Sequence, residues 1–298
     1  MPNALESLGQ LFQNSLPKGT DPESSKQYLT LFLLIDAFYK FLDELPGSSI
    51  TQVPQTFAET LRVANRMCRF VLGGQTVIGT GFLVGPSHVL TAAHLFYEAG
   101  ESGKGRVIDP DRATSIGVEF DTMLMGSYLT ASGNPRIVEL HDDWAVDPKV
   151  NGSSAHREVE VLDFAVVRLR EPVGEESIGG GKARQWFEIP EPANVATVAR
   201  SSMIHIFQYL DRGRLRSSIG SIKGINPART RMFYGASTLD AASGSAVLDD
   251  QLRLVGVHVG GEDEDHPLAN QGLPLHRIAR YLEDQGTRTN ISPPIPVE

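Results

Sequence analysis

The chain has 298 residues, of which 41% are hydrophobic and 21% charged, and its formal net charge is −9. This composition supplies enough apolar side chains for a folded core and is not that of a disordered chain. The acidic balance argues against a nucleic-acid partner, which needs clustered Lys and Arg, and against an anionic membrane surface. The single cysteine, Cys68, excludes an internal disulfide and a zinc site built from several cysteines.

The sequence carries no sign of export or membrane insertion. Its first residues, MPNALE, lack a basic region followed by an apolar run, so we expect no signal peptide. The longest apolar run, Leu31 to Ile35, is far shorter than the roughly 20 residues of a membrane span. We therefore expect a cytoplasmic protein.

Residues 1–55 are predicted to form a helical appendage. Residues 3–15 place apolar side chains at helical spacing, and the pair Asp21-Pro22 begins a second helix that ends near Glu44. The second helix has a wide apolar surface, which must be buried on more than one side. Two explanations stay open: packing within this chain, or docking to a regulatory protein or a second copy. A third helix over residues 55–64 leads into the main domain.

Beyond residue 66 the pattern changes to short apolar segments separated by turns, without helices between them. This pattern indicates antiparallel barrels or a sandwich. Residues 97–157 are less regular, and residues 275–282 have the pattern of a C-terminal helix. The predicted strands are 68–72, 76–84, 88–91, 159–169, 196–199, 203–209, 220–225, 231–234, 246–248 and 252–259.

Three segments carry side chains that suit acyl-transfer chemistry. The segments GTGFLVG and VLTAAH place His94 at a strand end among small residues. In VLDFAVV, Asp163 lies within an apolar strand, where an unpaired carboxylate is costly and an imidazole N–H is a suitable partner. In STLDAASGSAV, Ser243 lies on a small-residue turn before a strand, with its hydroxyl outward beside backbone N–H groups. Taken alone, each of these three residues is more simply explained by a structural role.

Together the motifs resemble a known superfamily. The order of His94, Asp163 and Ser243 is that of the chymotrypsin-like serine proteases. The segments GTGF, TAAH, DFAV, SGSAV and GVHVGG also occur in the expected order, so residues 66–283 resemble this superfamily. They are most similar to its disulfide-free bacterial branch, the glutamyl endopeptidases and exfoliative toxins.

The resemblance implies a fold and a domain organisation. We expect a mainly β protein with a chymotrypsin-like double antiparallel β-barrel, a small α-helical N-terminal extension and a C-terminal helix. The expected domains are the appendage over residues 1–55, which docks or regulates, a trypsin-like serine protease domain over 56–285, and a Pro-rich tail over 286–298.

The resemblance also implies a role for each site residue. Ser243 attacks the scissile carbonyl, His94 transfers the proton, and Asp163 fixes the His94 tautomer. The backbone N–H groups of Ala241 and Ser243 are the expected oxyanion hole. Ser245 is a competing nucleophile, but the family pattern places Gly directly after the nucleophile, which favours Ser243.

Two positions depart from the family pattern. Gly usually lies two residues before the nucleophile and Asp or Asn one before, where this chain has Ala241 and Ala242. Because a Cβ restricts φ and ψ, we expect Ala241 to resist the conformation that aims its N–H inward, leaving the hole unformed in a resting protein. Ala242 removes the carboxylate used in trypsin-type activation, so control must come another way. The alternative function is a catalytically inactive binding module.

Two further residues bear on substrate choice. Thr238 and His258 lie at the offsets from Ser243 at which glutamyl endopeptidases bind the substrate carboxylate, so cleavage after Glu or Asp is expected. Ser237 replaces the pocket Asp that selects Arg or Lys, and residues 262–265 form an acidic loop. A core role for His258 is the competing explanation. The sequence shows no metal-ligand spacing, so we expect no metal, no cofactor, and a protein substrate as the partner.

Overall fold

The computed structural model describes residues 59–60, 62–96, 113–121, 135–146, 162–177, 183–209, 215–238, 241–261 and 269–296. The predicted appendage over residues 1–55 and the acidic loop at 262–265 lie outside these ranges. Residues 59–60 and 62–65 are helical, in agreement with the predicted helix that leads into the main domain.

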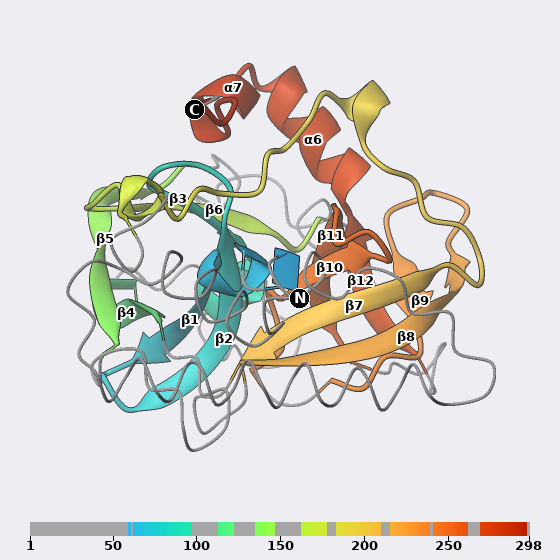
Figure 1. The fold of residues 1–298 in the computed structure, drawn as a ribbon, viewed down its shortest axis with the longest axis horizontal. Coiled ribbons are helices and arrows are strands. Elements are labelled where there is room, and N and C mark those ends of the chain that lie inside the picture. Colours follow the sequence, from blue (N-terminus) through green and yellow to red (C-terminus); the bar gives the residue numbers. More distant parts are fainter. Residues whose placement is uncertain are drawn as a thin grey trace, which may run out of the picture.

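The first six strands close into an antiparallel barrel with the order β1-β2-β3-β6-β5-β4, seen on the left of Figure 1. In β5, Val138 and Leu140 point into the barrel, whereas Ile137 and Glu139 face solvent, which is the period-two alternation of a half-buried strand. The strands are β1 (Met67–Leu72), β2 (Thr76–Leu83), β3 (His88–Thr91), β4 (Ile116–Phe120), β5 (Arg136–Ala145) and β6 (Ala165–Leu169).

The other six strands close into a second antiparallel barrel, with the order β10-β11-β12-β9-β8-β7. It lies on the right of Figure 1. Closure pairs every strand on both sides and so removes exposed sheet edges. The predicted double antiparallel β-barrel is therefore confirmed. The strands are β7 (Met203–Tyr209), β8 (Leu215–Ile225), β9 (Met232–Tyr234), β10 (Ala246–Asp249), β11 (Leu254–Gly260) and β12 (Asn270–Pro274).

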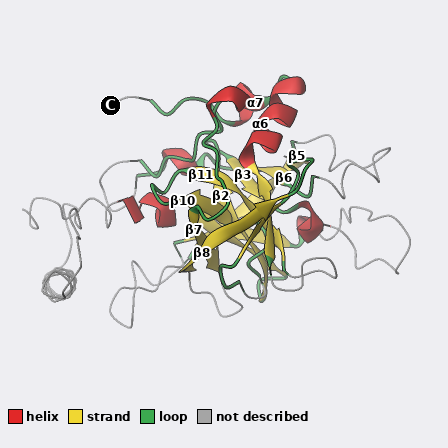
Figure 2. Cartoon of the chain, turned by 90° about the vertical axis from the view of Figure 1, so that its right-hand side faces the viewer, coloured by secondary structure: helices red, strands yellow, loops and turns green. Residues whose placement is uncertain are grey.

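Helices lie outside the two barrels. The predicted C-terminal helix is α6 (Leu275–Asp284), which is followed by the short α7 (Arg288–Ile291). Figures 1 and 2 both place these two helices on the same side of the strands. The buried face of α6 packs into a core cluster that includes residues from both barrels, so it helps to fix one barrel against the other. The short 3-10 helices are η1 (Ala93–Phe96), η3 (Val173–Glu175) and η4 (Pro192–Asn194).

The end of the described chain packs against the connector between the barrels, which is the segment from β6 to β7. Ile291 is 1% exposed, and the Ser292 hydroxyl accepts a hydrogen bond from the backbone N–H of Ile189, at 2.8 Å. The indole N–H of Trp186 donates to the carbonyl oxygen of Pro293, at 2.9 Å. The Pro-rich segment predicted as a tail is therefore bonded to the body as far as these residues.

The strand predictions were wrong in five places. β4, β5 and β12 were not predicted, because β4 and β12 are short and contain glycine, while β5 carries many outward polar side chains. Residues 196–199 form no strand. Their apolar side chains, Ala196 and Val198, instead pack against the second barrel's core. Within the predicted strand at 159–169, residues 159–161 lie outside the described ranges, residues 162–164 form no strand, and β6 begins at Ala165. Asp163 therefore precedes a strand instead of lying within one.

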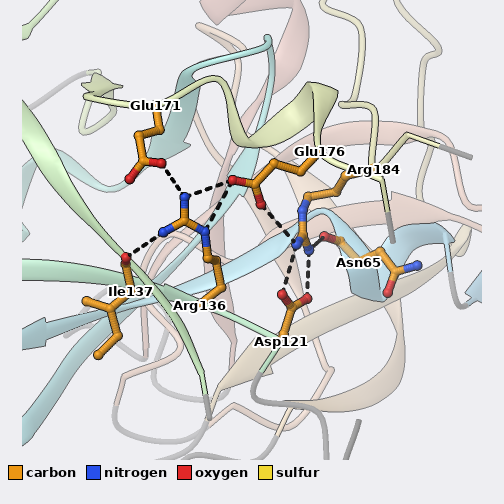
Figure 3. Close-up of polar contacts among 7 residues, drawn as sticks. All are labelled: Asn65, Asp121, Arg136, Ile137, Glu171, Glu176 and Arg184. Carbon is orange, nitrogen blue, oxygen red and sulfur yellow. Dashed lines mark hydrogen bonds and ion pairs between the residues drawn. The ribbon is translucent and has the colours of Figure 1, made fainter. Parts of the chain in front are cut away.

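A cluster of charged side chains braces the first barrel against the connector (Figure 3). The Arg184 guanidinium binds both carboxylate oxygens of Asp121, at 2.8 and 2.9 Å, and donates to the carbonyl oxygen of Asn65. Arg136 donates to Glu176, at 2.8 Å, on the segment after β6. The Arg184 side chain is only 3% exposed, so removal of Asp121 would leave a buried cation with only the more distant carboxylate of Glu176, at 4.0 Å.

Candidate active site

His94 and Asp163 lie in contact although 69 positions separate them in the sequence. Strands β3 and β6 pair antiparallel, with Thr91 opposite Ala165, so the segments beyond these paired ends meet. One Asp163 oxygen lies 2.7 Å from Nδ1 of His94, and the other accepts the His94 backbone N–H at 3.0 Å. The prediction that Asp163 needs an imidazole partner agrees with this geometry.

This geometry determines which atom of His94 is available for proton transfer. Asp163 is 7% exposed, while the His94 side chain is 28% exposed. A carboxylate accepts the Nδ1–H proton, so Nε2 of the neutral ring is left as a proton acceptor. The orientation of the ring is therefore fixed from behind by a nearly buried carboxylate, which is the arrangement that a general base requires.

Ser243 lies on the turn that leads into β10 of the second barrel. Its side chain is partly exposed, whereas Ser245 is fully buried. The N–H of Ser245 donates to the carbonyl oxygen of Ala242, at 2.9 Å, which closes the turn. The carbonyl oxygen of Ser243 accepts the backbone N–H of Thr80, at 2.8 Å, so the turn is bonded to the first barrel.

Glycine is the residue type that fits the turn at position 244, directly after Ser243. Its φ is +87°, in the left-handed region, and a Cβ there would lie 2.1 Å from the carbonyl oxygen of Thr80. The same Cβ would lie 2.1 Å from Oγ1 of Thr91. Gly244 therefore lets the Ser243 turn pack directly against β2 and β3, the strands that lead to His94.

Ala241 also has a left-handed backbone, with φ +70°. The sequence led us to expect that its Cβ would resist the conformation that aims its N–H inward. A left-handed backbone conformation costs an alanine roughly 1–2 kcal/mol. The backbone adopts it nevertheless, and the carbonyl oxygen of Ala241 accepts the Thr80 hydroxyl at 2.8 Å. The peptide that carries the Ala241 N–H includes Asp240, outside the described ranges, so the unformed oxyanion hole stays a prediction.

Thr80 is a site residue that sequence reasoning missed. Besides its bonds to Ser243 and Ala241, its hydroxyl oxygen accepts the backbone N–H of Tyr209, at 3.0 Å. Its carbonyl oxygen accepts the Thr91 hydroxyl, at 2.6 Å. Thr80 is fully buried and joins strands of both barrels beneath the Ser243 turn. The GTGF motif marked the segment, but nothing local indicated where this hydroxyl points.

His258 lies on β11 and is 2% exposed. Its Nδ1 is 2.8 Å from the hydroxyl of Tyr234, which also donates to the carbonyl oxygen of Gln271 at 3.0 Å. Burial lowers the pKa of His258 to about 4, with the nearby His94 as the second cause. His258 is therefore an uncharged imidazole at neutral pH. Tyr234 was not predicted, because the residues meet across strands.

Thr238 is half-buried and has a side-chain partner of its own. Its hydroxyl donates to Oδ1 of Asn270, at 2.8 Å. The Asn270 amide in turn donates to the carbonyl oxygen of Ala236, at 2.5 Å. The adjacent Ser237 accepts the side-chain amide of Gln208 at its backbone oxygen, at 2.9 Å. Asn270 begins a strand that the sequence pattern did not predict, so no signal pointed to it.

The described part of the chain holds no group of three or more His, Cys, Asp or Glu side chains arranged to bind a metal ion. The absence of a cofactor remains a prediction. None of the helices that the structure describes combines the length and apolar character needed to cross a bilayer.

A family model and solved structures are similar to this chain. A family model described as a trypsin-like peptidase domain matches residues 79–257, more than half of the chain. No curated protein gives a match. The MamO protease domain from Magnetospirillum magneticum is 15% identical, with a TM-score of 0.49, over 74% of this chain and 97% of that one. A Glu endopeptidase structure is 20% identical, with a TM-score of 0.49, over 79% of this chain and 95% of that one.

The family match spans the three residues of the predicted triad. It begins within β2, beside Thr80, and ends within β11, next to His258. His94, Asp163 and Ser243 all lie inside it. The fold of two closed six-stranded barrels is the one that the sequence resemblance implied. The chain belongs to the trypsin-like peptidase family.

Proposed function

We propose that this protein is a serine endopeptidase in which Ser243, His94 and Asp163 form the catalytic triad. Membership of the trypsin-like peptidase family supports peptide hydrolysis in general. The observation that carries the triad is the double contact of Asp163, which holds both the backbone N–H and Nδ1 of His94. A histidine held in this way from a buried carboxylate is typical of a general base rather than of a surface residue.

The proposed reaction follows the usual chemistry of an activated hydroxyl. Ser243 Oγ attacks the scissile carbonyl as Nε2 of His94 takes its proton, and Asp163 stabilises the imidazolium. The oxyanion binds the N–H groups of Ser243 and Ala241. His94 then gives the proton to the leaving amine as the peptide C–N bond breaks. A water molecule, deprotonated by His94, hydrolyses the acyl enzyme and restores Ser243.

Ser243 is preferred over Ser245 as the nucleophile for two reasons. Ser245 is 0% exposed, whereas Ser243 is partly exposed on the turn. Gly244 also lets the backbone of Ser243 approach the strands that lead to His94. A substrate can therefore reach the Ser243 hydroxyl without any opening of the core.

Thr238 and His258 are proposed to contact the side chain that precedes the cleaved bond. The sequence resemblance suggests Glu or Asp at that position, whereas the hydrogen bonds of both residues favour glutamine. Latency controlled by a partner of residues 1–55 remains a prediction. Latency rests on Ala241, whose left-handed backbone places a Cβ where the family pattern has none. A latent enzyme requires a signal that sets the Ala241 peptide, and docking at the N-terminal segment is the proposed source.

Cleavage of a peptide library by the full chain tests the function. We expect cleavage, read by mass spectrometry, that disappears in Ser243→Ala and persists in Ser245→Ala. Thermal melting of both variants controls for folding. If cleavage were lost in Ser245→Ala but kept in Ser243→Ala, Ser245 rather than Ser243 would be the nucleophile. The absence of Ser243-dependent cleavage from every peptide would favour the inactive binding module.

A further inference from the structure

Three neighbouring strands of the second barrel bring Tyr234, His258 and Asn270 onto one face of the sheet. Tyr234 on β9 pairs with Asn270 on β12, and His258 on β11 pairs with Gly272 on β12. Asn270 and Gly272 are two residues apart, so all four positions lie on the same face of the sheet. A Cβ at Gly272 would lie 3.0 Å from the Tyr234 hydroxyl. The ring of Tyr234 therefore crosses β12 over Gly272 to reach His258.

The hydroxyl of Tyr234 determines the tautomer of His258. It has one proton and two neighbours: the carbonyl oxygen of Gln271 at 3.0 Å, and Nδ1 of His258 at 2.8 Å. A carbonyl oxygen can only accept, so the proton goes to Gln271 and Nδ1 of His258 carries its own proton. Because burial lowers the pKa of His258 to about 4, the ring is neutral. Its second nitrogen, Nε2, is then an acceptor with no proton to offer.

Asn270 fixes the proton of Thr238 in the same way. The Asn270 amide nitrogen donates to the carbonyl oxygen of Ala236, so the atom that faces Thr238 is Oδ1. Oδ1 cannot donate, and it therefore takes the only hydroxyl proton of Thr238. Oγ1 of Thr238 is left with lone pairs alone. Oγ1 of Thr238 and Nε2 of His258 are thus both hydrogen-bond acceptors.

We propose, on the basis of the serine endopeptidase function, that the enzyme cleaves after glutamine rather than after glutamate, and that Tyr234 and Asn270 determine this specificity. A primary amide brings two N–H donors, one for Oγ1 of Thr238 and one for Nε2 of His258. A carboxylate brings no donor and meets two acceptors. A lysine or arginine brings donors, but a buried cation without a counter-charge is costly.

Peptides that differ only in the residue before the cleaved bond test the proposal. We compare kcat/KM of the full-length enzyme for peptides with Gln, Glu or Lys at that position, with Ser243→Ala as the blank. The expected result is a kcat/KM for the Gln peptide at least tenfold above the other two. Equal or faster Ser243-dependent cleavage after Glu overturns the specificity and leaves the endopeptidase intact. No Ser243-dependent cleavage of any library peptide overturns both.

Substitution of Asn270 separates specificity from folding. Asn270→Ala releases the Thr238 proton into the site, so the ratio of Glu to Gln cleavage rises about tenfold. Asn270→Asp keeps an acceptor oxygen for Thr238, and the ratio stays low. Thermal melting of both variants shows how much each is destabilised, and the ratio is measured on the folded protein. An unchanged ratio in Asn270→Ala contradicts the proposal.

Tyr234 is tested by a spectroscopic signature together with kinetics. In ¹⁵N-histidine-labelled enzyme near pH 7, with His258→Gln for assignment, His258 is expected to show a protonated Nδ1 and an unprotonated Nε2. Tyr234→Phe removes the hydroxyl, and the advantage of Gln over Glu is expected to fall about tenfold. A wild-type His258 that is protonated at Nε2, or an unchanged advantage in Tyr234→Phe, rejects the assigned roles.

Discussion

The two barrels position their parts of the site in different ways. On the first barrel, His94 is oriented by Asp163, which comes from the same barrel and binds both of its N–H groups. On the second barrel, the Ser243 turn depends on the other barrel. The carbonyl oxygens of Ser243 and Ala241 both accept hydrogen bonds from Thr80. The proposed base is therefore held within one barrel, whereas the position of the proposed nucleophile depends on both barrels.

This difference separates the expected effects of substitutions. Changes beneath the Ser243 turn, in β2 or β3, should impair catalysis even though they touch neither His94 nor Asp163. Changes to Asp163 should impair the base without moving the turn. The predictions below test this separation, from the largest expected effect to the smallest.

Asp163→Asn should cause the largest loss. An amide in place of the carboxylate favours the wrong His94 tautomer, and a triad that loses this carboxylate loses about 10⁴-fold in kcat. Kinetics on one peptide substrate measures the loss. Asp142→Asn is a matched control in the same barrel, because the Asp142 side chain is 78% exposed. It should keep full activity, and a loss below tenfold in Asp163→Asn would contradict the proposed role.

Gly244→Ala should be the most destabilising single change at the turn. Its Cβ would meet Thr80 and Thr91 at 2.1 Å, and the left-handed backbone adds its own cost, together about 4 kcal/mol. Gly74 is the matched control, because its φ is +69° but a Cβ there meets nothing within 4 Å. Gly74→Ala should lose only about 1–2 kcal/mol. Equal losses in urea unfolding would show that contact between the barrels is unimportant.

One histidine in each barrel, the partly buried His88 in the first and the buried His258 in the second, has a pKa that desolvation lowers to about 4. An unfolded histidine takes up a proton near pH 6.5, before either folded group does, so acid favours the unfolded chain. Each group should therefore lower stability by up to about 3 kcal/mol as pH falls from 6.5 to 4. Unfolding across this range should show a shallower slope in His88→Asn. An unchanged slope would show that His88 does not contribute.

Thr80→Val should lower kcat about 10- to 100-fold with little change in KM. The substitution keeps the shape of the side chain but removes the bonds to Ala241 and Tyr209, each worth about 1–3 kcal/mol when its partner is buried. Thr80→Ser keeps the hydroxyl and should keep most of the activity. If Val and Ser behave alike, the hydroxyl does not position the turn.

Ala241→Gly should have the smallest effect, and in the favourable direction. Relief of the left-handed strain gains about 1–2 kcal/mol, and the greater freedom of the unfolded glycine removes about half of it. The melting temperature should rise by a few degrees, and activity should be kept or increased. A loss of stability would show that the Ala241 backbone is not strained.

The sequence predicted strands that are rich in consecutive apolar residues, such as β3 and β7, and it named candidate residues for the chemistry. β3 and β7 were predicted at their observed bounds. β12 was not, because it is held by pairing with β9 and β11 on its two sides rather than by its own propensity. Local pattern cannot show what a neighbouring strand supplies.

The same limit applies to the site. His94 and Asp163 were paired correctly, because a buried carboxylate requires a partner and few are available. Thr80, Tyr234 and Asn270 escaped prediction, because each acts by a hydrogen bond to a residue distant in sequence. Ala241 drew attention only because it has a Cβ where the family pattern has glycine, and its backbone is left-handed despite that Cβ. Contacts across strands fix these conformations.

The most direct test of the proposed nucleophile is covalent labelling of the native full-length protein by a fluorophosphonate, with the modified residue mapped by mass spectrometry. A serine activated by His94 reacts with this probe, and an unactivated hydroxyl does not. The account predicts one label, on Ser243, that is lost in Ser243→Ala and strongly reduced in Asp163→Asn. A native protein that takes no label, or takes it on Ser245, would contradict the account.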